Sequence, residues 1–178
     1  MPTFADTSEN ALLAPSEALT RFDPYAGALL GPGQSGDARR VRYGFRVGSL
    51  SLLIQADTRS EVVEARGIAA MPNAPRWLAG YMNLRGNPVP VFDLCAALDL
   101  PRNDAAQKTM VLVLDKGDQA AGLLIDGVPR VVPPGEEIDQ PATLPARLAP
   151  FVSQAITTDN GVWLEFDHAG FLTSLAAA

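Results

Sequence analysis

The sequence predicts a mainly β protein made of two similar small barrels, and three observations carry this prediction. The apolar stretches are short, and Gly, Asn, Asp and Pro separate them, as expected for strands joined by tight turns. The same plan of strands and turns occurs twice along the chain. Each copy offers only four or five short strands, too few to cover two faces as an open sheet, so a small closed barrel suits each copy.

Composition limits the class of protein and of partner. The chain has 178 residues with 47% hydrophobic content, which suits one compact domain or two small modules that share a core. Fourteen Lys and Arg against twenty Asp and Glu give a net charge of -6, so we expect no nucleic-acid partner.

The sequence also predicts a cytoplasmic protein without direct membrane insertion. No apolar run approaches the roughly 20 residues that span a bilayer, and the N-terminus lacks a basic region followed by an apolar stretch. A single cysteine, Cys95, cannot form an internal disulfide, which fits a reducing compartment.

The chain is expected to divide into a leader and a folded domain. Residues 1–40 mix small and polar residues with many Pro and Gly, and we interpret them as a partly mobile leader. The folded domain is expected over residues 41–178, with a first module at about 41–100 and a second at about 109–178.

The first module is expected to begin with a hairpin and a helical turn. Tyr43, Phe45 and Val47 alternate with polar residues and Gly, and Gly48-Ser49 turns the chain into residues 50–54, which predicts a hairpin with one buried face. Residues 58–61 have capping-box spacing ahead of two valines, which predicts a short helix that ends at Gly67.

A second hairpin forms the centre of the first module. The prediction places strands at residues 78–85 and 88–92, joined by Gly86-Asn87, because Gly reaches positive φ without steric cost. Pro88 and Pro90 lack a backbone N–H and mark the second strand as an edge or bulged strand. Asp93 is expected to cap a short helix.

The second module is expected to repeat these elements. Residues 110–114 and 121–125 predict a hairpin, residues 133–145 a long irregular passage rich in proline, and residues 155–158 and 162–166 a last hairpin. Asp167 is expected to cap a final helix.

Two constant offsets align the copies. With an offset of 69, Asp57 falls on Asp126, and residues 62–63 fall on residues 131–132, which are Val-Val in both copies. With an offset of 74, six positions match in chemical type: Trp77 with Phe151, Leu78 with Val152, Met82 with Ile156, Phe92 with Phe166, Asp93 with Asp167, and Leu98 with Leu172. We therefore expect Trp77 and Phe151 to hold equivalent core positions in the two modules.

The central stretch also resembles a known family. Asn83-Leu84-Arg85-Gly86 is followed by Val-Pro-Val-Phe-Asp-Leu at residues 89–94 and preceded by Pro-Asn-Ala-Pro at residues 72–75. This pattern is similar to the central signature of the CheW-like chemotaxis coupling proteins, and the resemblance covers roughly residues 43–175. It implies two SH3-like β-barrels, each of about five strands, packed together with short helices.

The sequence offers little catalytic chemistry. His168 follows Asp167 in the first turn of the last helix, where a solvated surface histidine is expected, and Cys95 has no adjacent basic group that would lower its pKa. Zinc ligands are too few, and Glu136-Glu137 is interpreted as solvated charge. We therefore expect no enzyme, no catalytic residue, no metal and no cofactor. A small-molecule-binding or hydrolytic barrel with a pocket between the modules is the alternative.

The candidate partner-binding site is the hairpin tip, formed by Asn83, Leu84, Arg85, Gly86 and Asn87. The second copy keeps the apolar frame but places Asp159 opposite Arg85, and a residue that only maintained the frame would not need an inverted charge. In the family that the chain resembles, the matching arginine lies where adaptor, kinase and receptor assemble. The resemblance implies a non-enzymatic adaptor between the regulatory domain of a CheA-type histidine kinase and the cytoplasmic tip of a methyl-accepting chemoreceptor.

Two departures qualify the resemblance. The long leader is similar to that of variants serving type IV pilus (twitching) or other non-swimming pathways. Pro129 stands where the first copy has its predicted helix, so contacts carried by that helix are in doubt for the second copy. The resemblance also extends to the kinase's own regulatory domain and to hybrid adaptors with a receiver domain. With about 135 residues for the coupling domain, we expect room for the leader and no further domain in these 178 residues.

Overall fold

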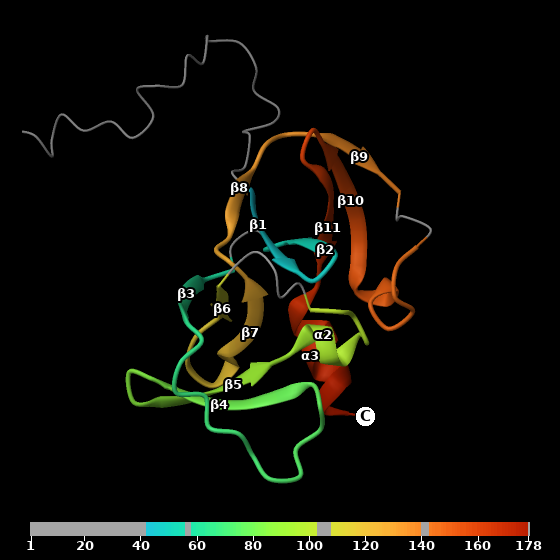
Figure 1. Cartoon of the computed structure of the whole chain (residues 1–178). Coiled ribbons are helices and arrows are strands. Elements are labelled where there is room, and N and C mark those ends of the chain that lie inside the picture. The colour runs from blue at the N-terminus through green and yellow to red at the C-terminus, as the bar shows by residue number, and fades with distance from the viewer. Residues whose placement is uncertain (1–41, 56–57, 103–107, 140–142, 178) are drawn as a thin grey trace, which may run out of the picture. The chain divides into compact units, whose positions relative to one another are not determined.

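Eleven short strands form two sheets in the computed structural model, which describes residues 42–55, 58–102, 108–139 and 143–177 (Figure 1). These residues belong to one compact unit, Arg39–Ala178, and the predicted leader lies outside them. One sheet, here the first barrel, has the order β3 (Ser60–Glu64), β6 (Thr109–Leu114), β7 (Ala121–Asp126), β5 (Asn87–Phe92), β4 (Leu78–Leu84). The other, the second barrel, has the order β8 (Arg130–Val132), β1 (Arg42–Val47), β2 (Leu50–Leu53), β11 (Gly161–Phe166), β10 (Val152–Thr158), β9 (Glu136–Ile138).

Both sheets close into barrels in the same way. After β3 the chain continues to Ala69, which pairs with Tyr81 on β4 through two backbone hydrogen bonds of 2.8 and 3.0 Å. After β8 the chain continues into β9, where Ile138 pairs with Ala155 on β10. The two pairs occupy equivalent positions in the sequence copies, since the offset of 69 relates Ala69 to Ile138 and the offset of 74 relates Tyr81 to Ala155. The predicted fold class, mainly β with two similar small barrels, is therefore confirmed.

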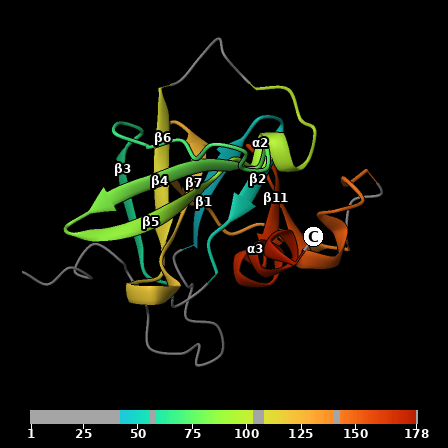
Figure 2. The same cartoon turned by 90° about the horizontal axis from the view of Figure 1, so that it is seen from below.

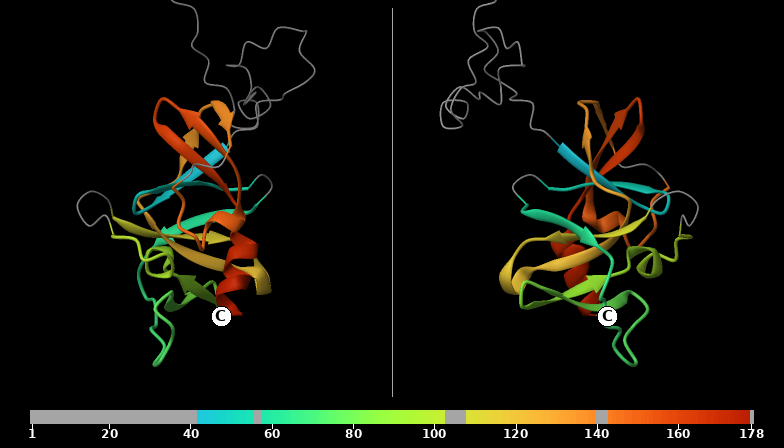
Figure 3. Two further views of the ribbon diagram at one scale, coloured as in Figure 1. Left: turned by 90° about the vertical axis from the view of Figure 1, so that its right-hand side faces the viewer. Right: turned by 60° about the vertical axis from the view of Figure 1, so that its left-hand side comes forward.

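The barrels exchange hairpins between the sequence copies. The β1–β2 hairpin comes from the first copy but lies in the second barrel, where Leu52 pairs in parallel with Leu164. The β6–β7 hairpin comes from the second copy but lies in the first barrel, where Gly122 pairs with Val91. Figure 3 shows β1 and β2 between the orange and red strands of the second barrel and the strands of the first. Neither barrel is a continuous stretch of chain.

Three apolar clusters hold this arrangement together. Each barrel has its own interior, which includes Met82 and Val113 in the first and Leu53 and Trp163 in the second. The largest cluster contains residues of both exchanged hairpins, such as Phe45 of β1, and of the two helices. Because the hairpins contribute to this shared core, separating the barrels would expose it to water.

The two α-helices of the described residues follow equivalent strands. α2 (Leu94–Ala97) begins after β5, and α3 (His168–Ala176) begins after β11. The carboxylates of Asp93 and Asp167 accept the N-capping hydrogen bonds from Ala96 and Gly170, as predicted. Two 3-10 turns, η1 (Gly117–Gln119) and η2 (Ala149–Phe151), precede β7 and β10.

The predicted helix at residues 58–67 is wrong. Residues 60–64 of this segment form β3, which pairs with β6 over its whole length, with Val62 opposite Leu112. Two adjacent β-branched valines favour a strand, and pairing with β6 outweighs the capping-box spacing. Residues 127–133 of the second copy hold β8, so Pro129 precedes a strand in place of a helix and the predicted departure disappears.

The strand predictions need four further corrections. The central hairpin turns through Arg85-Gly86, one residue earlier than predicted, because Leu84 pairs with Asn87. β5 lies between β7 and β4, so it is not an edge strand along its whole length. Only Val91 and Phe92 pair with β7, however, and its two prolines lie in the half that pairs with β4 alone, as expected for residues without an N–H. Residues 133–145, predicted to be irregular, contain the short strand β9 at Glu136–Ile138. Tyr43 is half exposed, although the pattern predicts it on a buried face.

Trp77 and Phe151 hold equivalent positions but are only partly buried. The carbonyl of each accepts a hydrogen bond from the aspartate that caps the following helix, Asp93 or Asp167. The Trp77 ring stacks on Phe92 with centroids 5.7 Å apart, and the Phe151 ring contacts Phe171 edge to face. Both pack at the margin of the shared core.

Candidate functional site

The tip of the β4–β5 hairpin is a two-residue turn with a fixed shape. Arg85 and Gly86 both have positive φ, 53° and 90°, as a type I′ turn requires. The side-chain oxygen of Asn83 accepts a hydrogen bond of 2.8 Å from the Gly86 N–H, which holds the turn closed. Figure 2 shows that the hairpin projects away from α2 and α3. The turn therefore presents Arg85 at the end of the first barrel.

Arg85 pairs with an acid of its own chain. Its Nη2 lies 2.6 Å from Oε1 of Glu61 on β3, and the Arg85 side chain is 75% exposed. This ion pair joins the tip of the hairpin to β3, the strand at the opposite edge of the same sheet. The guanidinium has five N–H donors, so one pairing with Glu61 leaves others directed to solvent.

A depression of about 270 Å³, here the tip groove, lies beside this ion pair. Leu84, Val89, Val113 and Ala120 provide its apolar surface. The lining residues are Arg59, Ser60, Glu61, Leu84, Arg85, Asn87, Val89, Val113, Asp115, Lys116, Gly117 and Ala120. They come from β3, β4, β5, β6 and the two turns at one end of the first barrel, so the groove is formed by strands far apart in the sequence.

The charges of the tip groove are unevenly paired. It has three cations, Arg59, Arg85 and Lys116, and two acids, Glu61 and Asp115. Glu61 forms an ion pair with Arg85, and Asp115 forms a hydrogen bond with His168. Arg59 and Lys116 have no ion pair within the described part of the chain. A protein of net charge -6 thus has a locally basic groove over an apolar floor.

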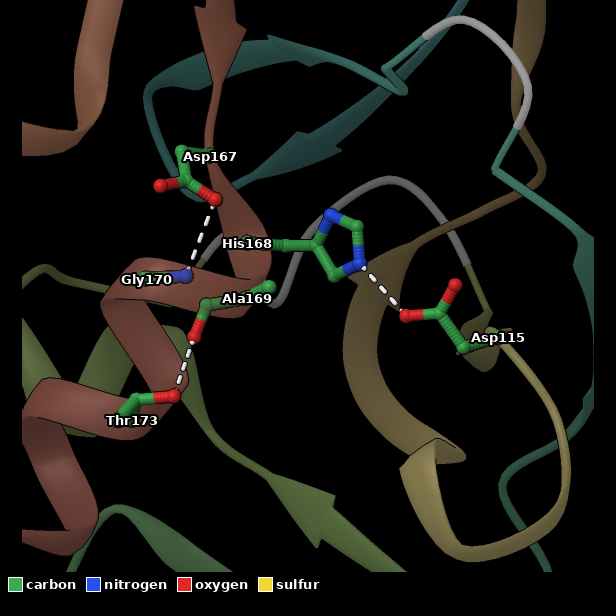
Figure 4. A network of polar contacts seen from close by, with 6 residues as sticks. All are labelled: Asp115, Asp167, His168, Ala169, Gly170 and Thr173. Atoms are coloured by element: carbon green, nitrogen blue, oxygen red, sulfur yellow. Dashed lines mark hydrogen bonds and ion pairs between the residues drawn. The ribbon is translucent and has the colours of Figure 1, made fainter.

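His168 joins the wall of the groove to the second barrel. Its Nε2 lies 3.0 Å from Oδ2 of Asp115, and its side chain is buried, whereas the sequence predicts a solvated histidine (Figure 4). Asp115 follows β6, and its N–H donates to the carbonyl of Arg59. The prediction failed because α3 packs its first turn against the first barrel, a contact that spacing does not reveal.

The structure brings the predicted residues together in two roles. Leu84, Arg85 and Asn87 line the tip groove, while Asn83 and Gly86 form the turn that supports it. The sequence reasoning missed Arg59, Glu61, Asp115 and Lys116. A strand at residues 60–64 would have placed Glu61 in register with Val113 of β6, but the capping-box interpretation hid this signal.

Cys95 and the acidic side chains of the described residues are poorly suited to catalysis or metal binding. Burial raises the pKa of the Cys95 thiol, and neighbouring Asp93 adds to the effect, so its nucleophilic thiolate is disfavoured. Within residues 42–55, 58–102, 108–139 and 143–177, no group of three or more His, Cys, Asp or Glu side chains could hold a metal ion. In the same residues no helix is long and apolar enough to cross a membrane.

The exchanged, closed barrels define a fold of two SH3-like modules, and comparison with known proteins agrees. The chain superposes on the crystal structure of the scaffolding protein TtCheW from Thermoanaerobacter tengcongensis with a TM-score of 0.65. The superposition covers 80% of this chain and 93% of that one at 21% identity. A family model described as the CheW-like domain matches residues 43–176. The chain therefore belongs to the CheW-like domain family.

The named relatives include a chemotaxis protein and a protein named PilI. The chain is 30% identical over 97 residues to a probable chemotaxis protein CheW from Rhizobium etli, which covers 54% of this chain and 63% of that protein, less than two thirds of its length. It is 29% identical over 137 residues to Protein PilI from Pseudomonas aeruginosa. That alignment covers 72% of this chain and 76% of PilI.

Proposed function

We propose that this protein is a non-enzymatic cytoplasmic adaptor of a chemotaxis-like pathway. It binds the regulatory domain of a CheA-type histidine kinase and the cytoplasmic tip of a methyl-accepting chemoreceptor. Holding both partners on one scaffold raises their effective concentration and allows a receptor change to bias the kinase. Membership of the CheW-like family is the observation that carries the proposal.

The tip groove is the proposed contact for one of these partners. Its apolar floor and its cations, Arg59, Arg85 and Lys116, suit a partner surface that combines apolar and acidic side chains. The planar fork of Arg85 can engage a carboxylate through two parallel hydrogen bonds, which lysine cannot do. Such a partner either displaces Glu61 from Arg85 or binds the donors that Glu61 leaves free.

Binding of the purified protein to each partner tests the proposal. The chain should co-elute with a kinase regulatory domain and with a receptor-tip fragment. Arg85→Ala should weaken at least one of these complexes by about 2 kcal/mol or more if the contact is a desolvated charge pair, and Arg85→Lys should restore little. Wild-type affinity of the Arg85→Ala variant for both partners would remove the proposed site.

The alternative of a small-molecule or hydrolytic barrel has less support. It needs convergent titratable groups in a pocket, and the cleft that lies between elements of both barrels is lined by Pro75, Trp77, Arg147, Phe171, Ser174, Leu175 and Ala176, with no Asp or Glu. The relatives include both CheW and PilI proteins, so swimming and pilus-based motility are both proposed outputs.

A further inference from the structure

A second concave surface lies between the loop before β4 and the C-terminal part of α3. This α3 cleft has a volume of about 710 Å³. Its lining residues are Pro75, Trp77, Arg147, Phe171, Ser174, Leu175 and Ala176. None of them lines the tip groove. The cleft therefore forms a separate surface, to which both sequence copies contribute.

Arg147 is the one charged residue among those that line the α3 cleft. Its backbone is fixed by a turn in which the carbonyl of Pro145 accepts hydrogen bonds from Leu148 and Ala149, and Leu148 is completely buried. Its Nη1 donates a long hydrogen bond of 3.4 Å to the carbonyl of Ala97. No carboxylate of the described residues lies within ion-pair distance of it. A positioned guanidinium thus retains donors for an external acid.

The cleft is built where the two copies differ. With the offset of 74, Arg147 falls on Asn73, so the first copy has no cation at this position. α2 has only four residues, whereas α3 has nine and supplies Ser174, Leu175 and Ala176 to the cleft from its last turns. Because the first barrel folds without these features, the barrel frame does not require them.

We propose that the α3 cleft binds a segment of a partner protein in which a carboxylate neighbours a large apolar side chain. The guanidinium of Arg147 pairs with the carboxylate, and the apolar side chain packs against Trp77 and Leu175. Charge complementarity selects the acid, since the cleft has one cation and no anion. The chain as a whole has a net charge of -6, so a cleft with a cation and no acid is a local exception that can attract an acidic segment.

Peptide titration of the full chain tests this inference. The probes are short peptides with Glu, Asp or a C-terminal carboxylate beside Leu or Phe in a Gly/Ser background, each with a matched peptide bearing Gln, Asn or a C-terminal amide. Backbone and indole N–H signals are followed by NMR. Acidic peptides should shift the Trp77 indole signal, leave that of buried Trp163 in place, and bind about tenfold or more tightly than their amide counterparts.

Variants decide whether Arg147 is responsible. Arg147→Ala should weaken binding of the acidic peptides about tenfold or more and leave the melting temperature unchanged, because the side chain is exposed. Arg76→Ala is the matched control, since Arg76 is an exposed neighbour of Trp77 that does not line the cleft. Arg85→Ala should leave the titration of the Trp77 indole signal as it is in the wild type, which separates this inference from the proposed function. It is overturned if no acidic peptide shifts Trp77 or if Arg147→Ala binds them unchanged.

Discussion

Asp93 and Asp167 make the same two hydrogen bonds, one set in each barrel. The carboxylate of Asp93 accepts from the Ala96 N–H at 3.1 Å, and that of Asp167 accepts from the Gly170 N–H at 3.0 Å. Their own N–H groups donate to the carbonyls of Trp77 and Phe151, at 2.7 and 2.8 Å. Each aspartate thus joins a helix to the residue that precedes its barrel's hairpin.

Replacing either aspartate by alanine should destabilise the fold through loss of a helix cap. We expect about 1 kcal/mol for Asp167→Ala and more for Asp93→Ala, because Asp93 also pairs with Arg102 and its side chain is only 13% exposed. Urea unfolding measures both changes. Asparagine at either position should recover most of the cap energy, and equal losses for Asn and Ala would contradict the capping role.

Local pattern predicted the elements whose stability is local. The capped helices and the hairpins at residues 43–54, 110–125 and 155–166 follow from alternation and turn residues that lie next to one another in sequence. β3 was mistaken for a helix because its capping-box spacing is local, whereas its partner β6 lies about 50 residues away. Exchange of hairpins between the barrels is equally non-local, and no spacing signal reports it.

The candidate site shows the same limit. Arg85 was predicted as exposed at a hairpin tip because the tip is a local structure with an inverted charge in the second copy. Its partner Glu61 was missed because the pairing joins β3 to the β4–β5 hairpin, which are brought together only when the sheet closes. Arg59, Asp115 and Lys116 reach the groove only when β3 and β6 lie side by side. Contacts between distant strands therefore decide which residues line the tip groove, and the spacing of residues along the sequence does not reveal these contacts.

Truncating Trp77 should cost less than truncating a residue of the shared core. Trp77 is half-buried and stacks on Phe92, so Trp77→Ala should destabilise by about 2 kcal/mol, compared with about 3 to 5 kcal/mol for Phe45→Ala, which removes a side chain that is 2% exposed. Chemical unfolding of the two variants compares them directly. If the two variants lose the same free energy of unfolding, Trp77 contributes as a core residue does. If Trp77→Ala loses less than about 1 kcal/mol, the stacking of Trp77 on Phe92 does not stabilise the fold appreciably.

Gly44 should tolerate no side chain. A Cβ at this position would lie 2.2 Å from Cζ3 of Trp163 and 2.7 Å from Cγ2 of Val132, both in the interior of the second barrel. Gly44→Ala should therefore cost about 1 to 3 kcal/mol by overpacking and should alter the fluorescence of Trp163. Ser49→Ala, at the exposed turn of the same hairpin, is the control. Wild-type stability of Gly44→Ala would mean that the Trp163 ring can move aside.

The two roles of Arg85, pairing with Glu61 and pairing with a partner, can be separated by exchanging the charges. Arg85→Ala and Glu61→Ala should each change the free energy of unfolding by less than about 1 kcal/mol, because the ion pair is exposed. The double variant Arg85→Glu with Glu61→Arg keeps an ion pair within the chain but presents an acid at the tip. If Arg85 binds a partner carboxylate, this variant should fold normally and bind as poorly as Arg85→Ala or worse, through like-charge repulsion. Calorimetric titration with the kinase regulatory domain and the receptor-tip fragment measures this. Recovery of wild-type affinity would show instead that Arg85 serves only to tie the hairpin to β3.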